Sequence, residues 1–264
     1  ISTGTFKKMK IDIHTHILHN CDDGSNSLEL SIKQITNMID KGVTDIVLTH
    51  HYMNSYVQTD AKIINKQYKE IVKATSDLNI NLHKGGEIFL NPGMEEKISK
   101  KLCIADTSYI LVETNMGEFT PDIYEILFEL VRNGYKPILA HPERYNYIMN
   151  KPEIAEDFLH RNVYLQINAG SILGLYGNRI AKTAWYLIDN GFAHFIASDN
   201  HCKADEYILP AALEAIRDNI DDYTANLLSQ KNPEKMLNDE KIKYFYLEKQ
   251  PVEKSGFLKK ILNR

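Results

Sequence analysis

Strand-length apolar runs alternate with helix-length segments along most of this chain. The runs are rich in Ile, Val, Leu and Tyr, and most lack the alternation of polar and apolar residues that a half-exposed strand shows. Seven runs are present, at residues 10–14, 44–50, 80–89, 108–113, 136–141, 163–168 and 193–199. Strands that alternate with helices run parallel and have the helices outside them. The pattern therefore predicts an α/β fold in which seven parallel strands form a barrel.

Helix-length segments follow the runs, and glycines mark where several of them end. Gly42, Gly134 and Gly191 each come after a helical pattern and before the next strand, where a left-handed C-cap is needed. A polar tail is expected from about Gln230. The expected helices cover residues 27–41, 60–78, 121–133, 152–161, 178–190, 204–219 and 222–228.

The chain's 264 residues are enough for one large domain or two small ones, and one barrel with a short extension accounts for them. We expect the barrel at residues 9–240 and a C-terminal extension at 241–264. Residues 1–8 are expected to be a leader or an appended segment, because Met9 stands directly before the first strand. The basic end, 254–264, is expected to be a frayed or peripherally packed terminus rather than a membrane or partner contact.

Composition and charge exclude several classes of protein. Lys and Arg total 31 against 35 Asp and Glu, for a net charge of −4, and the basic residues are scattered, which argues against nucleic-acid binding. The sequence has no run of about 18 apolar residues, and residues 1–10 lack the apolar segment of a secretion signal. Cys21, Cys103 and Cys202 are far apart and odd in number, which fits a reducing compartment. We therefore expect a cytoplasmic protein.

Histidines and carboxylates cluster at the C-terminal ends of the expected strands, which meet at one face of a parallel barrel. His14 and His16 are two residues apart on an extended chain, so both imidazoles can reach one metal ion. Asp199 and His201 repeat this spacing at the last strand. Six of the seven strands end in histidine or a carboxylate, and this recurrence predicts a metal centre.

The candidate ligands outnumber what one ion can bind and suffice for two or three divalent ions with a bridging carboxylate. Spacing alone leaves Asp22 or Asp23 open, and it likewise leaves the choice between His50 and His51. All the candidates offer nitrogen or oxygen, which suits Mn, Fe or Zn in an open catalytic cluster. They are His14, His16, Asp23, His51, Glu87, Glu113, His141, Asp199 and His201. The histidines off the strand ends are expected to be packing or surface residues: His19, His83, His160 and His194.

Arg144 follows the fifth strand in the segment His141-Pro-Glu-Arg144, where its guanidinium can bind two phosphate oxygens at the metal face. A surface salt bridge is the alternative. A cysteine-based tyrosine phosphatase needs Arg six positions after its Cys, and none of the three cysteines has one. The sequence also lacks a Gly-x-x-x-x-Gly-Lys-Ser/Thr phosphate loop and a Gly-x-Ser-x-Gly nucleophile motif.

Eight short segments contain most of these polar residues: Ile11-Asp-Ile-His-Thr-His-Ile-Leu18, Asp22-Asp-Gly24, residues 42–51, Gly86-Glu-Ile88, Ile110-Leu-Val-Glu113, Leu139-Ala-His-Pro-Glu-Arg-Tyr145, Leu165-Gln-Ile-Asn-Ala-Gly-Ser171 and Ser198-Asp-Asn-His201. In order and spacing they resemble the PHP (polymerase and histidinol phosphatase) superfamily. Within it, the chain is similar to the capsule- and exopolysaccharide-locus protein tyrosine phosphatases of Gram-positive bacteria. The resemblance spans residues 9 to about 230 and implies a distorted seven-stranded (β/α)7 barrel of the PHP type around a three-metal site.

The resemblance also implies how the ions are shared. It implies three ion sites: the first formed by His14, His16, Glu87 and Asp199, the second by Glu87, Glu113 and His141, and the third by Asp23, His51 and His201. It thereby selects Asp23 over Asp22 and His51 over His50. Mn²⁺ is the expected ion, with Fe or Zn as alternatives. The expected catalytic residues are Arg144, Asp199 and His201. One departure is visible, since relatives commonly carry Pro where this chain has His50.

The implied reaction is hydrolysis of a phosphate monoester, with phosphotyrosine on a protein as substrate. Metal coordination would lower the pKa of a bound water from about 15.7 towards about 7, and Arg144 would stabilise charge on the phosphate oxygens. The phenolate product, with a pKa of about 10, would leave readily. The implied partner is a bacterial tyrosine kinase of the polysaccharide locus, through which any membrane association would be peripheral.

Two other functions stay open. A small-molecule phosphatase of the same superfamily, such as a histidinol phosphatase, would share the barrel and the metals, and the Asp-Asp-Gly and His-Pro-Glu-Arg signatures favour the tyrosine phosphatase instead. A metal-stabilised binding module without activity is typical of some PHP domains attached to polymerases. Those domains lose ligands, whereas every expected position is filled here.

Overall fold

The computed structural model describes residues 11–52, 61–93 and 98–243, and its strands form two sheets in which each pair is parallel. The smaller sheet has the order β1-β2-β4 and consists of β1 (Ile11–Thr15), β2 (Asp45–Leu48) and β4 (Asn81–Lys84). The larger sheet has the order β3-β5-β6-β7-β8-β9 and consists of β3 (His51–Tyr52), β5 (Glu87–Phe89), β6 (Tyr109–Glu113), β7 (Lys136–Ala140), β8 (Tyr164–Asn168) and β9 (Phe195–Ala197). The α/β class and the parallel strands are therefore confirmed.

One closed barrel of seven strands is not confirmed among the described residues, because two of the expected strands are interrupted. The run at 80–89 divides into β4 and β5 at Gly85 and Gly86, and β3 follows β2 but belongs to the other sheet. A Cβ on Gly85 would lie 3.0 Å from Val47 Cγ1, so a side chain at this position would press against β2. The ladder breaks where this glycine pair passes β2.

The first and last strands lie side by side, although they are almost 200 residues apart in the sequence. The amide of Asp199 donates to the carbonyl of His14 at 2.9 Å, and the amide of His16 donates to the carbonyl of Asn200 at the same distance. Thr15 and Asn200 form an isolated parallel bridge. Residues at the ends of β1 and β9 can therefore share one site.

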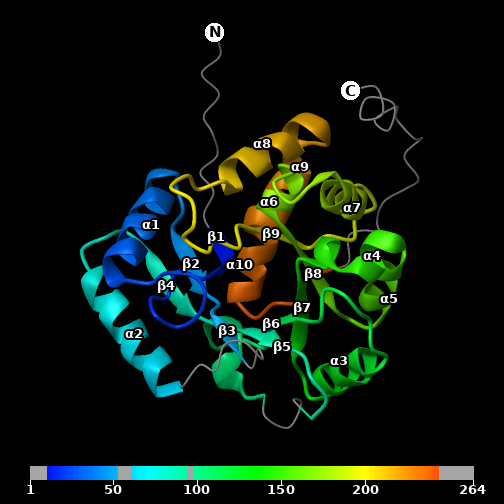
Figure 1. The fold of residues 1–264 in the computed structure, drawn as a ribbon, viewed down its shortest axis with the longest axis horizontal. Helices are drawn as coiled ribbons and strands as arrows, with labels where there is room; N and C mark the ends of the chain where they lie inside the picture. The colour runs from blue at the N-terminus through cyan, green and yellow to red at the C-terminus, as the bar shows by residue number, and fades with distance from the viewer. Residues whose placement is uncertain (1–10, 53–60, 94–97, 244–264) are drawn as a thin grey trace.

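Helices surround the two sheets (Figure 1). Ser27 caps the first helix by accepting a hydrogen bond from the Leu30 amide at 3.1 Å. Gly42, Gly134 and Gly191 follow their helices with left-handed φ angles of 88°, 86° and 70°, as predicted. The helices are α1 (Leu28–Asp40), α2 (Ala61–Ala74), α3 (Asp122–Arg132), α4 (Asn146–Asn150), α5 (Ile154–His160), α6 (Ala169–Ile172), α7 (Asn178–Asp189), α8 (Leu209–Asn219), α9 (Asp222–Asn226) and α10 (Asn232–Leu237).

The chain after residue 230 is not the polar tail that the sequence suggests. It forms α10, and Met236 of this helix is fully buried in a hydrophobic cluster made largely of alternate strand residues. The hydroxyls of Tyr109 and Tyr164, at the starts of β6 and β8, donate to the carbonyls of Glu240 and Ile242 at 2.5 and 3.2 Å. The segment from 232 to 242 thus covers the N-terminal ends of the strands and leaves the C-terminal ends for the site.

Several expectations fall outside the described residues. They are the leader or appended segment at 1–8 and the basic end at 254–264, while the extension expected at 241–264 is described only as far as residue 243. Among the described residues, no helix combines the length and the apolar character needed to cross a membrane.

Candidate metal centre

Two histidines of β1 and two carboxylates from distant segments meet at the C-terminal ends of the strands. His14 Nε2 lies 3.2 Å from Glu87 Oε2 and 3.3 Å from Asp199 Oδ1. His16 Nε2 lies 3.3 Å from each of the same two oxygens and 3.2 Å from His14 Nε2. Ligands that surround a cation tetrahedrally at about 2.0 Å are about 3.3 Å from one another. The separations therefore fit one cation held by His14, His16 and Glu87, with Asp199 Oδ1 at 3.3 Å from both histidines.

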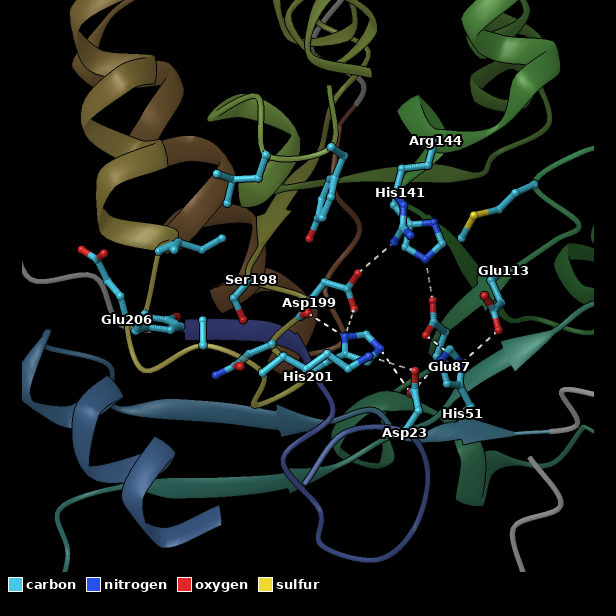
Figure 2. Close-up of a pocket in the computed structure, with 18 residues that line it drawn as sticks. Asp23, His51, Glu87, Glu113, His141, Arg144, Ser198, Asp199, His201 and Glu206 are labelled. Atoms are coloured by element: carbon cyan, nitrogen blue, oxygen red, sulfur yellow. Dashed lines mark hydrogen bonds and ion pairs between the residues drawn. The ribbon is translucent and has the colours of Figure 1, made fainter. Parts of the chain in front are cut away.

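A second group shares Glu87 with the inner group, and Figure 2 shows its members Glu87, His51, Glu113 and His141. His51 Nδ1 is 3.1 Å from Glu87 Oε2 and 3.0 Å from Glu113 Oε1. His141 Nε2 is 2.9 Å from Glu87 Oε1. The resemblance pairs His141 with Glu113, whereas in the structure the imidazole that faces Glu113 is that of His51. His51 thus stands between the second group and the outer one.

The outer group contains Asp23, His201, His51 and His16, whose ligand atoms all lie within 4.8 Å of one another. His201 Nε2 is 3.3 Å from Asp23 Oδ1, and His51 Nε2 is 3.7 Å from the same oxygen. The Asp23 side chain is half exposed, whereas Glu87 is fully buried. Through Asp23, the outer group reaches solvent more than the inner group does.

Three carboxylate oxygens in this cluster are buried, and each of them faces imidazole nitrogens at distances of 3.0–3.4 Å. They are Glu87 Oε2, Glu113 Oε1 and Asp199 Oδ1, and they come from three different strand ends. A buried carboxylate oxygen is costly unless a donor or a cation satisfies it. Nitrogen and oxygen ligands without thiolate suit divalent ions such as Mn, Fe or Zn. The side chains present therefore fit a centre for divalent cations.

The electrostatics of the inner group favour positive charge. Burial alone would lower the pKa of His14, yet the carboxylates of Glu87 and Asp199 raise it to about 9. Burial alone would raise the pKa of Asp199 and Glu87, but the imidazole of His14, with other histidines, holds both well below their ordinary range. Without metal, protonated imidazoles thus occupy a place with strong negative potential.

Hydrogen bonds with neutral amides and with one carboxylate orient these candidate ligands on the side away from the proposed ion. Gln166 Oε1 accepts from His14 Nδ1 at 2.7 Å, and Gln166 Nε2 donates to Asn168 Oδ1 at 2.8 Å. Asn168 Nδ2 in turn donates to Asp199 Oδ2 at 2.6 Å. An imidazole that donates through Nδ1 keeps the Nε2 lone pair for a metal. Sequence reasoning missed this role, and the signal was the two-residue spacing of Gln166 and Asn168 on β8, which matches that of the histidines on β1.

Asp22 also orients a candidate ligand and is not itself a candidate ligand. Its Oδ2 accepts from His16 Nδ1 at 2.6 Å and from the His51 amide at 3.0 Å. Because these bonds engage the carboxylate, Asp22 belongs to none of the ligand groups, and Asp23 takes that place. Asp22 therefore fixes the orientation of His16.

The remaining histidines lie outside the ligand groups. His50 is buried, its pKa is lowered to about 4 by burial, and neither ring nitrogen has a hydrogen-bond partner among the described residues. His83 Nε2 contacts Asp45 Oδ1 at 2.9 Å, and His19 Nε2 contacts Glu70 Oε2 at 3.2 Å. The two others expected to be packing or surface residues, His160 and His194, likewise belong to none of the described groups.

Arg144 lies at the rim of a cavity of about 480 Å³, which has the size of a small-molecule site. The cavity is lined by ligands of all three groups (Figure 2). His141 has a left-handed φ of 36°, and the chain then enters the short 3-10 helix Pro142–Arg144. Arg144 Nη1 lies 3.3 Å from Asp199 Oδ2. The guanidinium is therefore placed beside the metal centre and open to a ligand in the cavity.

Known proteins are similar to this chain in sequence and in fold. The model of the family for capsular polysaccharide synthesis, CpsB/CapC, matches residues 10–238. The CapC protein of Staphylococcus aureus is 35% identical over 196 residues, which cover 72% of this chain and 76% of that protein. The tyrosine-protein phosphatase CpsB of Streptococcus agalactiae is 33% identical over 201 residues, which cover 72% of this chain and 82% of that protein.

A solved structure gives the same result. It comes from crystal structures of YwqE from Bacillus subtilis and CpsB from Streptococcus pneumoniae, which are described as unique metal-dependent tyrosine phosphatases. It matches with a TM-score of 0.83 and 26% identity, over 92% of this chain and all of that one. The predicted resemblance is thereby confirmed, and the chain belongs to the CpsB/CapC family of capsular polysaccharide synthesis proteins.

Proposed function

We propose that this protein is a metal-dependent phosphomonoester hydrolase that acts as a protein tyrosine phosphatase. The observation that carries the proposal is the set of buried carboxylate oxygens of Glu87, Glu113 and Asp199, which face imidazole nitrogens beside an open cavity. Relatives that this chain matches over more than two thirds of their own length are named tyrosine-protein phosphatases, which supports the same activity here. The neighbouring Arg144 supplies a group for the phosphate.

Nine residues are the proposed ligands of two to three divalent cations, with Mn²⁺ as the expected ion. They are His14, His16, Asp23, His51, Glu87, Glu113, His141, Asp199 and His201. Bound cations would lower the pKa of a water molecule towards about 7 and offset the charge of the phosphate. The donor set supports this assignment because imidazole and carboxylate are shared by Mn, Fe and Zn sites.

The proposed catalytic residues are Arg144, Asp199 and His201. Arg144 would bind two phosphate oxygens and stabilise the negative charge that grows on them during reaction. Asp199 holds the guanidinium through Oδ2 and turns Oδ1 towards the inner group. His201 belongs to the outer group on the side of the cavity. The phenolate of tyrosine, with a pKa of about 10, leaves without needing a strong acid.

We further propose that the two sheets make the wall of one distorted seven-stranded barrel. In this arrangement β2 with β3 and β4 with β5 count as two interrupted strands. The backbone bonds between β1 and β9 support closure of the wall at its ends.

The proposed substrate is a phosphotyrosine protein, and the proposed partner is a bacterial tyrosine kinase that regulates polysaccharide synthesis. The family's connection with capsular polysaccharide synthesis supports this choice. We also propose a cytoplasmic location, because the three cysteines are free thiols and the proposed kinase substrate would be encountered in the cytoplasm.

The activity is tested with the full chain, stripped by a chelator and then reloaded with Mn²⁺. We expect hydrolysis of a phosphotyrosine peptide to disappear on chelation, return on reloading and exceed turnover of histidinol phosphate. The double variant His14→Ala, His16→Ala should be inactive, whereas His83→Ala, His160→Ala should retain activity. Turnover that survives chelation, or that persists in the first double variant, would remove the proposal, and preferred turnover of histidinol phosphate would favour a small-molecule phosphatase.

A further inference from the structure

Three large apolar side chains are exposed at the mouth of the cavity. Leu175 is 60% exposed, Tyr176 is 40% exposed and Met116 is 36% exposed, and all three line the same cavity as the proposed metal ligands. The other large apolar side chains that are exposed in the described residues do not line it: Ile63, Val72, Phe128 and Tyr223. Exposed apolar surface that gathers at a cavity indicates a binding surface.

The backbone presents Leu175 and Tyr176 in a fixed turn. Gly174 and Gly177 on either side adopt left-handed φ angles of 75° and 97°, which residues with side chains rarely adopt. The amide of Leu175 donates to the carbonyl of Gly170 at 2.9 Å, and the amide of Gly177 donates to the carbonyl of Gly174 at 3.1 Å. The turn is therefore held by its own hydrogen bonds while its two large side chains stay open to solvent.

Close packing sets the position of the Tyr176 ring. A Cβ on Gly170 would lie 2.8 Å from the Tyr176 hydroxyl and 2.9 Å from two carbons of its ring, so the outer end of the ring lies directly against Gly170. Met116 also lines the cavity, and its carbonyl accepts from the Asn146 amide at 2.8 Å. Thioether side chains adapt well to aromatic rings. Met116 and Tyr176 thus offer the cavity surfaces that suit a flat apolar group.

Tyr176 also contacts the residue proposed to bind phosphate. The guanidinium carbon of Arg144 lies 5.1 Å from the centre of the Tyr176 ring, within the range of a cation–π contact. Arg144 in turn contacts Asp199 in the inner group. A cationic group that can bind phosphate therefore adjoins an apolar surface. A phenyl phosphate ester is complementary to this pair, because its phosphate would meet Arg144 and its ring would meet the apolar surface.

We propose that Met116, Leu175 and Tyr176 form a rim that binds the aromatic ring of the substrate and selects aryl over alkyl phosphomonoesters. This inference rests on the proposed phosphatase function and adds the determinant of its substrate class. Aromatic contacts act on binding of the ring and not on the reacting phosphorus. The rim should therefore govern KM for phosphotyrosine peptides and leave kcat nearly unchanged.

The test compares two inhibitors that share a phosphonate and differ in the ring. Binding of benzylphosphonate and methylphosphonate to the Mn²⁺-loaded full chain is measured by calorimetry for Tyr176→Ala, Leu175→Ala and the wild type. We expect benzylphosphonate to bind roughly 10-fold more weakly to each variant, a loss of about 1.4 kcal/mol, and methylphosphonate to bind within about 2-fold of wild type. Tyr176→Phe should restore binding of the ring, and Phe128→Ala should change neither ligand.

Two results would overturn the rim. Equal weakening of both phosphonates would show that Tyr176 acts only by positioning Arg144, and unchanged binding of benzylphosphonate in both alanine variants would show that the ring lies elsewhere. These measurements need no turnover, so they stand apart from the activity. If the wild type binds benzylphosphonate through these residues but fails to hydrolyse a phosphotyrosine peptide, the proposed function is wrong, whereas the assignment of the rim as a ring-binding surface holds.

Discussion

His14 and His194 are both fully buried, but their surroundings move their pKa values in opposite directions. Burial lowers the pKa of His194 to about 3. Burial of His14 acts in the same sense, but the carboxylates of Glu87 and Asp199 raise its pKa to about 9. Both residues lie in the same fold at the same depth, so the neighbouring carboxylates make the difference. The C-terminal ends of the strands are built to hold positive charge, and the region around His194 is built to exclude it.

Two buried glutamates show the same contrast. Burial raises the pKa of Glu143, whose Oε1 accepts from the Asn168 amide at 2.9 Å. Glu87 is equally buried, yet the histidines around it hold its pKa well below the ordinary range. Glu143 therefore tends towards the neutral acid, while Glu87 is an anion that requires cations.

The largest expected effect follows from removing the charge of Glu87. Glu87→Gln should lower kcat/KM for a phosphotyrosine peptide by roughly 10³-fold, because one bridging anion supports two ligand groups and metal assistance is worth several kcal/mol. The pKa of His14 in the metal-free variant, followed by NMR, should fall. Glu143→Gln is the matched control and should keep most of the activity. Similar losses in both variants would break the contrast between the two glutamates.

Arg144 gives the next largest effect. Arg144→Ala should lower kcat by about 10²-fold, in line with the loss of one preorganised donor to developing charge. Arg144→Lys should recover only part of it, because an ammonium lacks the forked geometry that matches two phosphate oxygens. Steady-state kinetics at saturating Mn²⁺ measures this. Full activity in the alanine variant would leave Arg144 as a surface ion pair.

Gln166 should affect the metal more than the fold. Gln166→Leu removes the acceptor for His14 Nδ1, and loss of such a partner typically costs about 10- to 100-fold in metal affinity. Competition with a chelator measures the affinity. Asn232→Leu is the control. The Asn232 Nδ2 donates to the carbonyl of His194 at 2.8 Å, and neither residue belongs to the candidate metal groups. It should lower stability by about 1–3 kcal/mol without changing metal affinity.

A further prediction concerns the acid side of stability. His194 has a folded pKa of about 3 against an unfolded value of about 6.5, so the unfolded state binds the extra proton between these pH values. This contribution to stability is present above pH about 6.5 and is lost as the pH falls towards about 3. His194→Gln should therefore reduce the pH dependence of the free energy of unfolding by up to one proton in this window. Urea unfolding of the metal-free proteins at several pH values measures it, and identical slopes would contradict the shift.

The sequence indicates which side chains gather at one end of the strands because this geometry is local. His14 and His16 share a face of an extended strand, and parallel strands bring their C-terminal ends together whatever the details of the sheet. The roles of Gln166 and Asn168 depend on distances of 2.6–2.8 Å between different strands, which a neutral amide in a sequence does not reveal. The interruption at Gly85 depends on its approach to β2, which is also a tertiary property.

The C-terminal region shows the same limit. Polar residues from Gln230 onwards suggested a tail, but one apolar side chain, that of Met236, fills a cluster made by the strands and anchors α10. A single buried residue in a polar segment leaves no periodic signal. The division of ligands between ions was likewise beyond the sequence, because His51 faces both Glu113 and Asp23.

The central claim is that cations bind among the buried carboxylates of Glu87, Glu113 and Asp199. Anomalous diffraction from crystals of the full chain grown with Mn²⁺ tests it most directly. The account predicts two or three strong peaks, one of them within bonding distance of His14 Nε2, Glu87 Oε2 and Asp199 Oδ1. Crystals that hold Mn²⁺ only at the surface, with no peak between Glu87 and Asp199, would contradict it.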